Sequence, residues 1–320
     1  MSRRPTPLII AESDVGRFVT LEDAWRVIRE VFEDVASEDA LNFPVVRETL
    51  SASKAVFGVK SAQYRRYGVV GLKAGGYFPG NAARGDANHQ SFVILLDQET
   101  GKPRAIVGGN LLTRLRTAAS AALSIDTLAR CDAKTLAVVG AGAQAETHIR
   151  AALLARDFDK ILLWNRSKDR AAMLASQWTG SVPIKVTRSA EEAVRNADVV
   201  ITLTGSTQAI VMAEWVKPGC HLTCMGADTI GKQEVDIELV RKARVVTDSV
   251  AQATSIGECQ AAFRARRIGR EDIAVLGDVL RGLVPGRRSE TEVTLFDGTG
   301  VAAQDIAMAA LVAERASGLA

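Results

Sequence analysis

The strongest constraint on the fold is the segment Leu136–Ala145, an apolar run that ends in glycines and opens into an amphipathic stretch. This pattern is typical of a strand, a tight turn and a helix N-terminus that binds a pyrophosphate. Gly140 permits the turn, Gly142 lets backbone approach a phosphate, and Ala145 keeps the helix close to the strand. A lone G-x-G-x-x-A motif is weak evidence for a dinucleotide site, because glycines also end strands for structural reasons. Here a strand over 160–164 follows at the spacing of a βαβ unit, which favours a dinucleotide site.

Strand and helix patterns alternate after this turn, as they do in a doubly wound α/β sheet. The expected strands are short apolar runs, most of them separated by helical patterns. They fall at 134–139, 160–164, 182–186, 198–204, 220–225, 244–247 and 292–296. An alanine-rich helix over 301–315 should follow, and it could return to the domain that began the chain. The alternation, more than the glycines, predicts a Rossmann-type domain.

The chain before this region has a different pattern. A capping box at Thr20–Asp23 begins an amphipathic helix. Short strands follow, the last two as a hairpin. They are expected at 42–47, 57–59, 69–73, 92–96 and 105–107. An alanine-rich helix over 111–130 then leads into the first Rossmann strand, so this part of the chain is predicted to be an α+β domain.

The length of 320 residues exceeds what one hydrophobic core usually supports, so two domains are expected. We place the Rossmann dinucleotide-binding domain over 116–299. The α+β domain is then discontinuous and consists of residues 1–115 and 300–320.

Composition excludes several classes of function. The net charge is only +3 and there is no basic run, so nucleic-acid binding has no support. The four cysteines form no C-x-x-C motif and there are only three histidines, which argues against a metal site or a disulfide framework. No hydrophobic signal region follows Met1–Pro7, and no apolar run is long enough for a membrane span. We expect a soluble, cytoplasmic protein with reduced thiols.

Three segments carry polar residues that could perform chemistry. Lys73 lies in the glycine-rich run Gly71–Asn81, where open backbone favours close approach of a ligand, although a flexible surface turn would also explain it. Arg116 lies near the start of the alanine-rich helix and could bind a carboxylate bidentately or form a surface ion pair. Asp228 follows an expected strand at the ligand-binding edge, where a helix cap is about as plausible as catalysis.

Six separated segments, in order, resemble the ornithine cyclodeaminase and mu-crystallin family. They are Arg47, the G-x-K-x-x-x-x-P-x-N of Gly71–Asn81, the R-T-A-A-S of Arg116–Ser120, Val139–Gln144, the G-A-D-x-x-G-K-x-E of Gly226–Glu234, and Phe296–Val301. The resemblance implies a homodimer in which the discontinuous domain binds substrate and forms the dimer. It also implies NAD(H) or NADP(H) and chemistry at the carbon–nitrogen bond of amino or imino acids.

The resemblance also implies roles for individual residues. Arg47, Lys73 and Arg116 match the carboxylate-binding residues, and Asp228 matches the catalytic acid, with Lys73 as a second catalytic candidate. A carboxylate beside a protonated imine would stabilise the iminium whose carbon accepts a hydride. The expected cofactor-binding residues are Thr117, Gly140, Gly142, Ala143, Gln144, Asn165, Arg166, Thr204, Met225 and Gly300.

The substrate is expected to be a small anionic imino acid. A distal ammonium, as in ornithine, requires an acidic group, but the segment Lys54–Arg66 has four basic residues and no acid. A second anionic group on the substrate fits better. His89 could add a polar donor for it, or it could be a structural residue bonded to backbone. Several segments, among them Asn42–Arg47 and Leu295–Val301, resemble the iminosuccinate reductases of the β-hydroxyaspartate pathway, which form L-aspartate.

The cofactor assignment contains a conflict. Asn165 and Arg166 stand at the end of the second strand, where an acid would favour NAD and a neutral residue beside an arginine tolerates NADP. The resemblance to iminosuccinate reductases implies NAD(H), which we predict, with NADP(H) as the alternative and Asn165 on the adenosine ribose either way. We therefore predict an oxidoreductase that reduces iminosuccinate. The alternatives are an ornithine cyclodeaminase, a cyclic ketimine reductase, or a non-enzymatic ligand-binding protein of the mu-crystallin type.

Overall fold

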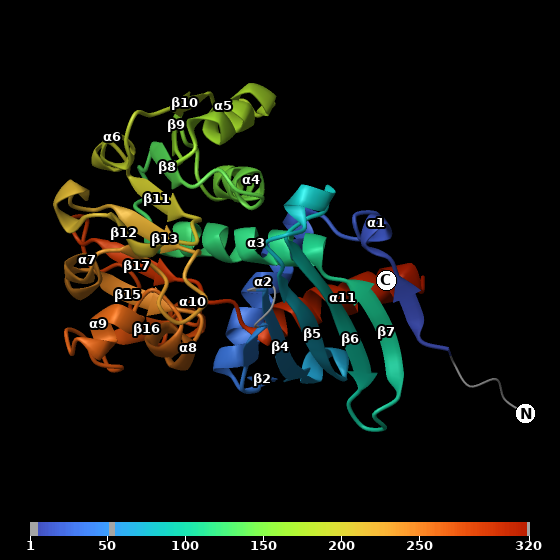
Figure 1. Ribbon diagram of the computed structural model, residues 1–320. Coiled ribbons are helices and arrows are strands. Elements are labelled where there is room, and N and C mark those ends of the chain that lie inside the picture. The colour runs from blue at the N-terminus through green and yellow to red at the C-terminus, as the bar shows by residue number, and fades with distance from the viewer. Residues whose placement is uncertain (1–5, 51–54, 319–320) are drawn as a thin grey trace, which may run out of the picture. The chain divides into compact units, whose positions relative to one another are not determined.

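The computed structural model describes residues 6–50 and 55–318. The chain divides into two compact units, one formed by residues 1–116 and 301–320 and the other by residues 117–300 (Figure 1). We call them the first and the second unit and describe each by itself. The expectations about Met1–Pro5 and Lys54 lie outside the described residues.

The first unit is built on one seven-stranded sheet with the order β1-β7-β6-β5-β4-β2, in which β3 also pairs with β4. Strand β1 runs parallel to β7, and the other pairs are antiparallel. The strands are β1 (Leu8–Ile10), β2 (Ala40–Asn42), β3 (Val46–Leu50), β4 (Ala55–Tyr64), β5 (Val69–Tyr77), β6 (His89–Asp97) and β7 (Pro103–Gly108). Short helical turns accompany them at α1 (Glu12–Val15), η1 (Arg65–Tyr67) and η2 (Ala82–Arg84).

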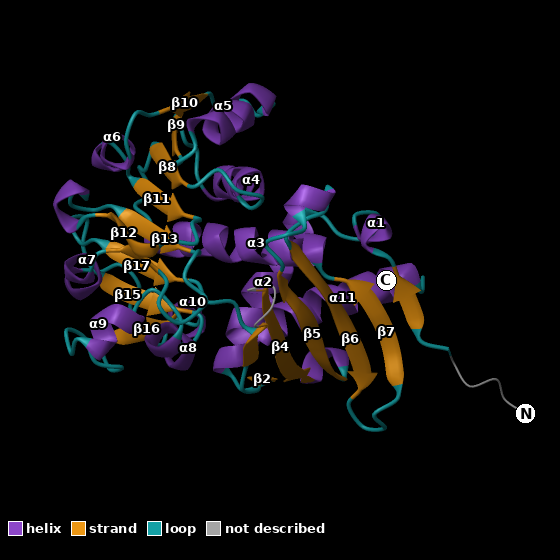
Figure 2. Ribbon diagram, in the orientation of Figure 1, coloured by secondary structure: helices purple, strands orange, loops and turns teal. Residues whose placement is uncertain are grey.

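Two long helices cover one face of this sheet (Figure 2). The helix α2 (Leu21–Ala36) begins at the predicted capping box. The Thr20 side chain accepts a hydrogen bond from the Asp23 backbone N–H, and the Asp23 side chain accepts one from the Thr20 backbone N–H. The helix α11 (Ala302–Ala316) packs against α2 and against β4, β5, β6 and β7. The side chains that α11 buries against the sheet are almost all small or apolar, which allows this close contact.

The glycines of the 71–81 run have a different role from the one expected. Most of this run belongs to β5 and is not an open loop. A Cβ on Gly75 would lie 2.1 Å from the Gln90 carbonyl oxygen, and one on Gly76 would lie 1.8 Å from that of Val56. The glycines therefore allow the neighbouring strands β4 and β6 to approach β5, and the prediction that they admit a ligand was wrong for this part of the run.

The second unit contains an eight-stranded, fully parallel sheet, which confirms the Rossmann-type prediction. Its order is β10-β9-β8-β11-β13-β17-β15-β16. The strands are β8 (Thr135–Val139), β9 (Lys160–Trp164), β10 (Ile184–Val186), β11 (Val199–Thr202), β13 (His221–Cys224), β15 (Arg244–Thr247), β16 (Ile273–Val275) and β17 (Thr294–Asp297). A separate two-stranded sheet pairs β12 (Thr207–Val211) with β14 (Gln233–Val235). The short strands β12, β14 and β16 were not predicted.

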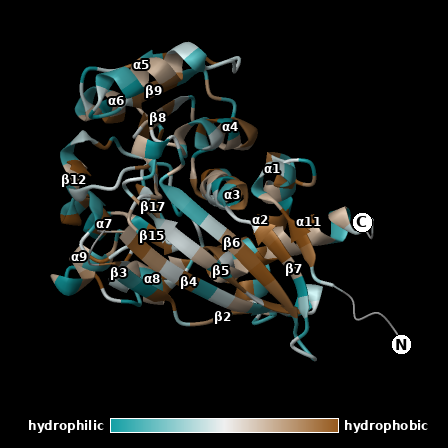
Figure 3. Cartoon of the chain, turned by 45° about the vertical axis from the view of Figure 1, so that its right-hand side comes forward, coloured by the Kyte–Doolittle hydropathy of each residue, from teal (hydrophilic) through white to brown (hydrophobic). Residues whose placement is uncertain are grey.

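The helix α3 (Asn110–Leu128) follows β7 and precedes β8. The other helices lie between strands of the second unit. They are α4 (Ala145–Ala155), α5 (Lys168–Gln177), α6 (Ala190–Arg195), η3 (Ala213–Trp215), α7 (Ile237–Lys242), α8 (Val250–Ser255), α9 (Gln260–Arg264) and α10 (Leu276–Leu280). Figure 3 shows hydrophobic segments along β7 of the first unit and β15 of the second. Residues of β8, β11 and β13 are fully buried in the second core, as parallel strands covered on both faces require. Among the described residues, no helix combines the length and the apolar character that crossing a bilayer demands.

Candidate active site

The predicted glycine turn joins β8 to α4. Gly140 has a φ of +120°, and a Cβ there would lie 2.9 Å from the Leu203 carbonyl oxygen, so the turn requires glycine. A Cβ on Gly142 would meet no atom within 4 Å, so the space beside it is open. The N-cap residue Gln144 makes no side-chain cap, and its buried Oε1 accepts no hydrogen bond from the described residues. The first turn of α4 thus keeps backbone donors for a pyrophosphate, and these residues fit the predicted dinucleotide.

Asn165 follows β9 and ties this turn to the neighbouring strand. Its Oδ1 accepts from the Ala141 backbone at 3.0 Å, and its Nδ2 donates to the Ser167 carbonyl at 2.9 Å. Arg166 is exposed beside it. The side chain of Asn165 therefore fixes the glycine turn, a role that the sequence did not indicate. Its contact with a ribose stays a prediction.

Glu234 organises the edge of the sheet where Thr204 and Met225 lie. It is buried on β14 and accepts hydrogen bonds from Thr202 Oγ1 at 2.6 Å, from the Thr204 backbone at 2.6 Å and from the Gly226 backbone at 2.8 Å. Burial raises the pKa of this carboxyl. Because Thr204 follows β11 and Met225 follows β13, Glu234 holds together the carboxyl ends of two adjacent strands, where doubly wound sheets bind ligands.

Asp228 lies in the loop after β13. Its Oδ1 accepts from Lys232 Nζ at 2.7 Å and from Thr229 Oγ1 at 3.1 Å, and its side chain is 40% exposed. The chain continues from this loop into β14 and no helix begins at Asp228, so the helix-cap alternative is wrong. An accessible carboxylate oxygen can accept a hydrogen bond from an N–H group of a ligand.

Gly300 belongs to a glycine loop after β17 that a buried aspartate shapes. Asp248 accepts from the Thr299 hydroxyl and from the Gly300 backbone, each at 2.5 Å. Gly300 has a φ of +74°, which only glycine adopts readily. Asp297, at the end of β17, is fully buried, and burial raises its pKa to about 7. Thr117 is buried within α3. Neither aspartate was predicted as a site residue.

Sheet register places three basic residues on one face of the sheet in the first unit. Lys60 of β4 pairs directly with Lys73 of β5, and Arg47 of β3 pairs with Gly58, two residues from Lys60 on the same side of β4. Since side chains alternate along a strand, Arg47, Lys60 and Lys73 lie on one face. With Arg116 of α3 we call these four residues the basic cluster.

Asp305 of α11 pairs with two members of the basic cluster. Lys73 Nζ lies 2.9 Å from each carboxylate oxygen and donates to Thr113 Oγ1 at 3.3 Å. Arg116 donates to Asp305 Oδ1 through Nε at 3.2 Å and to Gln304 Oε1 at 3.3 Å. Lys73 and Arg116 are only 8% and 7% exposed, and Asp305 is fully buried. This burial excludes the two alternatives, that Lys73 is a solvated surface lysine and that Arg116 belongs to an ordinary surface pair.

Burial shifts the protonation of this region. It lowers the pKa of Lys73 to about 8, where Asp305 opposes the shift and Arg116 and Arg47 add to it. Burial and the charge of Lys73 lower the pKa of His89 to about 4, and His89 Nδ1 lies 3.3 Å from Asn110 Oδ1. His89 is therefore neutral at pH 7 and lies within the field of the basic cluster. The hydrogen bond of His89 is made with the Asn110 side chain and not with the backbone, as the structural alternative had assumed.

Other parts of the basic segment Lys54–Arg66 face away from the cluster. Arg65 is exposed and donates to the Glu38 carbonyl, and Arg66 forms a bidentate pair with Asp34. Of the described cations of this segment, Lys60 belongs to the cluster, while Arg65 and Arg66 contact other parts of the first unit. Asp305 was not predicted from the sequence either, although an adjacent Gln–Asp pair within an alanine-rich helix is an unusual signal.

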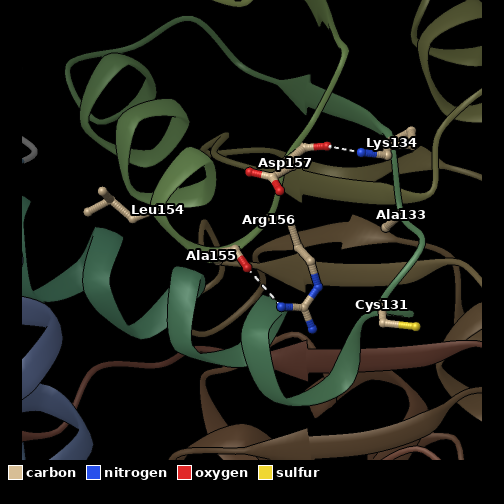
Figure 4. Close-up of a pocket in the computed structure, with 7 residues that line it drawn as sticks. All are labelled: Cys131, Ala133, Lys134, Leu154, Ala155, Arg156 and Asp157. Atoms are coloured by element: carbon tan, nitrogen blue, oxygen red, sulfur yellow. Dashed lines mark hydrogen bonds between the residues drawn. The ribbon is translucent and has the colours of Figure 1, made fainter.

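A surface cavity of about 430 Å³ in the second unit lies apart from these residues (Figure 4). It is lined by residues before β8 and after α4, among them Cys131, Lys134 and Arg156. Arg156 pairs with Asp126, and Lys134 donates to the Asp157 carbonyl. This is the amino edge of the sheet, opposite the glycine turn, so the cavity does not belong to the dinucleotide site.

Comparisons with known proteins agree on one family. A model of the ornithine cyclodeaminase/mu-crystallin family matches residues 6–319. The iminosuccinate reductase of Paracoccus denitrificans (strain Pd 1222) is 44% identical over 97% of this chain and 96% of its own length. A crystal structure of the Paracoccus denitrificans iminosuccinate reductase in complex with NAD⁺ matches with a TM-score of 0.90 and 42% identity, covering 98% of both chains. An archaeal alanine dehydrogenase dimer with bound NAD matches with a TM-score of 0.92 and 33% identity, covering 98% of this chain and 96% of its own. The protein described here is therefore a member of the ornithine cyclodeaminase/mu-crystallin family.

Proposed function

We propose that this protein is an oxidoreductase that reduces iminosuccinate to L-aspartate with NADH. The observation that carries the proposal is the basic cluster, in which Lys73 and Arg116 pair with the buried carboxylate of Asp305 while register places Arg47 and Lys60 on the same face of the sheet. Lysine and arginine side chains gathered on one face form strong hydrogen bonds and ion pairs with carboxylates. A substrate with two carboxylates suits such a cluster, and the 44% identity to an iminosuccinate reductase supports the same substrate.

In the proposed reaction the residues of the chain have separate roles. Arg47, Lys73 and Arg116 bind the carboxylate next to the imine and hold the reacting carbon in one orientation. Asp228 stabilises the protonated imine and then the amine that forms. The bound nicotinamide supplies the hydride.

We propose NAD(H) as the cofactor, bound by the residues around the glycine turn. The NAD⁺ complex of the Paracoccus enzyme supports this assignment. The open space beside Gly142 and the donors at the start of α4 support pyrophosphate binding. The neutral Asn165 and the exposed Arg166 leave NADP(H) as the competitor, and kinetics with NADPH decide between them.

We propose that two copies of the chain associate through the sheet face of the first unit opposite α11. On this face Val46, Phe57 and Phe92 are 53%, 37% and 44% exposed, although they lie on strands of one continuous sheet. An apolar sheet face of this kind is typical of a subunit interface. The archaeal alanine dehydrogenase, which is a dimer, supports a second copy as the occupant. The free thiols favour a reducing compartment, and we propose the cytoplasm.

The proposed activity is tested by following NADH and NADPH oxidation with a panel of imino acids. These are generated with ammonia from oxaloacetate and pyruvate, and cyclic imines are added directly. We expect the fastest turnover with the oxaloacetate-derived imine and NADH. Consumption of ornithine with release of ammonia and no net change in cofactor would instead identify a cyclodeaminase. Fastest turnover of a cyclic imine would identify a ketimine reductase, and ligand binding without any turnover would identify a binding protein.

A further inference from the structure

Glu12 caps the start of the helix that carries Arg116. Its Oε2 accepts a hydrogen bond from the Asn110 backbone N–H at 2.9 Å, and its Oε1 accepts one from the Leu111 backbone N–H at 2.7 Å. These are the first two residues of α3, whose N–H groups have no acceptor inside the helix. The positive end of the helix dipole also stabilises a carboxylate in this place. Glu12 therefore holds the first turn of α3 through two charge-assisted hydrogen bonds.

Glu12 itself is packed against the strand that leads into α3. It follows β1, which runs parallel to β7 with Ile10 opposite Val107. A Cβ on Gly108, the last residue of β7, would lie 2.5 Å from the Cα of Glu12 and 2.7 Å from its Oε2. Contact this close leaves Glu12 little freedom to move relative to the end of β7. The sheet thereby fixes the carboxylate from which α3 begins.

Two residues within the first two turns of α3 contact Lys73 and Asp305. Thr113 Oγ1 accepts a hydrogen bond from Lys73 Nζ at 3.3 Å, and Arg116 donates one to Asp305 Oδ1 at 3.2 Å. Thr113 and Arg116 are three residues apart and so lie on the same side of the helix. A shift of the first turn of α3 would therefore move both contacts together.

We infer that Glu12 is a positioning residue for substrate binding, because it fixes the start of α3 and thereby the place where Arg116 presents its guanidinium to the substrate carboxylate. The inference rests on the proposed function and adds a residue that acts through Arg116. Misplacing a binding group by about 1 Å can lower activity by orders of magnitude. Arg116 holds the carboxylate both before and during hydride transfer, so its displacement raises KM more than it lowers kcat.

The test measures KM and kcat for the oxaloacetate-derived imine in Glu12→Gln. Glutamine has the same shape without the charge, and it offers one acceptor oxygen where the carboxylate offers two. We expect KM to rise on the order of 10-fold while kcat changes less than about threefold. A merely structural role would instead lower the amount of folded enzyme, which reduces the apparent kcat and leaves KM unchanged. Asn110 Oδ1 still ties α3 to β6 by accepting from the Ser91 backbone at 2.9 Å, so we expect the variant to fold.

Three variants serve as matched comparisons. Asp14→Asn removes the same charge from α1, where Asp14 forms an exposed pair with Arg17, and should leave KM unchanged. Thr20→Ala removes the cap of α2, a helix that carries no member of the basic cluster, and should lower stability without changing KM. Glu12→Asp keeps the charge on a shorter side chain and should restore part of the affinity lost in Glu12→Gln. If Glu12→Gln does not fold, as judged by circular dichroism, Glu12→Asp replaces it with a smaller expected rise in KM.

A double-mutant cycle measures whether Glu12 acts through Arg116. In an Arg116→Met background, Glu12→Gln should cause less than about a twofold further loss of kcat/KM, because the group that it positions is gone. Additive losses would contradict the inference. An unchanged KM in folded Glu12→Gln would also contradict it, although the proposed function would stand.

The outcomes separate this inference from the proposed function. If the unchanged protein does not reduce the oxaloacetate-derived imine, the proposed function is wrong, and calorimetry with succinate then measures carboxylate binding without turnover. An affinity for succinate that falls in Glu12→Gln and not in Thr20→Ala supports the positioning role. The absence of succinate binding, an equal affinity in all three proteins, or an equal loss in both variants contradicts it.

Discussion

Asp228 differs from the other acidic residues near the carboxyl edge of the second sheet in its exposure. Glu234, Asp248 and Asp297 are buried, and each accepts at least one hydrogen bond from a backbone N–H group. Asp228 is accessible and forms an ion pair with Lys232. This contrast supports Asp228 as the group that meets the substrate nitrogen, and the buried acids as parts of the scaffold.

We expect Asp228→Asn to reduce kcat by about 100-fold or more, the usual contribution of a positioned acid or base. The affinity for NADH should change little, because the glycine turn is untouched. Stopped-flow turnover and fluorescence titration of NADH measure the two effects. Glu238→Gln, which neutralises an exposed acid paired with Arg241 and Arg267, serves as the control and should behave like the unchanged protein. If Asp228→Asn keeps the kcat of the unchanged protein, Asp228 does not have the assigned role.

Asp305 should act as a positioning residue through the protonation of Lys73. The protonated amine is the form that binds a carboxylate, so kcat/KM is expected to fall as the pH rises through about 8, the pKa of Lys73. Asp305 raises that pKa by its charge, against the effect of burial. In Asp305→Asn the loss of the negative charge lowers the pKa of Lys73, so the fall in kcat/KM should move to lower pH.

A pH profile of kcat/KM measures this displacement, which a purely structural role for Asp305 would not cause. Glu314→Gln, on the same helix but outside the cluster, should leave the profile in place. The Asp305→Asn variant should also lose about 3–5 kcal/mol of unfolding free energy, because two buried cations lose their partner. If folded Asp305→Asn loses kcat/KM at the same alkaline pH as the unchanged protein, Asp305 does not have this role.

At the scale of secondary structure, the β5 strand shows how glycine pattern and strand packing are related. Three of its residues, Gly71, Gly75 and Gly76, leave no room for a Cβ because backbone oxygens of neighbouring strands lie within 2.6 Å of that position. Such contact holds β4, β5 and β6 close together and fixes the face on which Lys60 and Lys73 lie.

We therefore expect Gly75→Ala to lower the free energy of unfolding by at least about 1–3 kcal/mol, the usual result of overpacking. Gly80→Ala is the matched control, because a Cβ there meets no atom within 4 Å. That variant should keep or slightly raise stability, since alanine restricts the unfolded chain. Urea unfolding followed by circular dichroism compares them. Equal midpoints for the two variants would show that the close strand contact is not needed.

Periodicity predicted the elements whose burial repeats along the chain. The parallel strands of the second unit are apolar runs that can be recognised without their neighbours, as Leu136–Val139 shows. The strands β12, β14 and β16 are three to five residues long and carry no such pattern, so they were missed. Lys60 and Asp305 could not be singled out, because their importance arises from register and from a helix that contacts the sheet across a long stretch of sequence. The glycines of β5 were misread for the same reason, since what they touch lies on other strands.

At the scale of the whole molecule, we expect the exposed apolar sheet face of the first unit to be buried by another protein surface. Phe92, Phe57 and Val46 lie on β6, β4 and β3, on the side of the sheet opposite to Lys60 and Lys73. A second copy that buries this face would keep both sides of the sheet from water. The basic cluster and the proposed dimer contact would then lie on opposite faces of the same sheet.

We expect Phe92→Asp to dissociate the dimer, because a charge would have to be buried in an apolar contact. Light scattering coupled to size-exclusion chromatography measures the mass directly. Met173→Asp places the same charge at another exposed apolar position, on α5, and should leave the mass unchanged. A chain that is monomeric before any substitution, or a dimer that survives Phe92→Asp, would refute this interface.

The partner of Lys73 and Arg116 is separated from them by a long stretch of chain, since Asp305 lies 232 residues after Lys73. At the usual pace of translation the ribosome needs roughly 10–50 s to synthesise that interval. During this time the strands of the first unit have emerged without the helix α11 that covers them and without the carboxylate that pairs with Lys73 and Arg116. We expect the nascent sheet to expose apolar side chains and the charge of Lys73 until α11 is synthesised, which makes this stage of folding prone to aggregation.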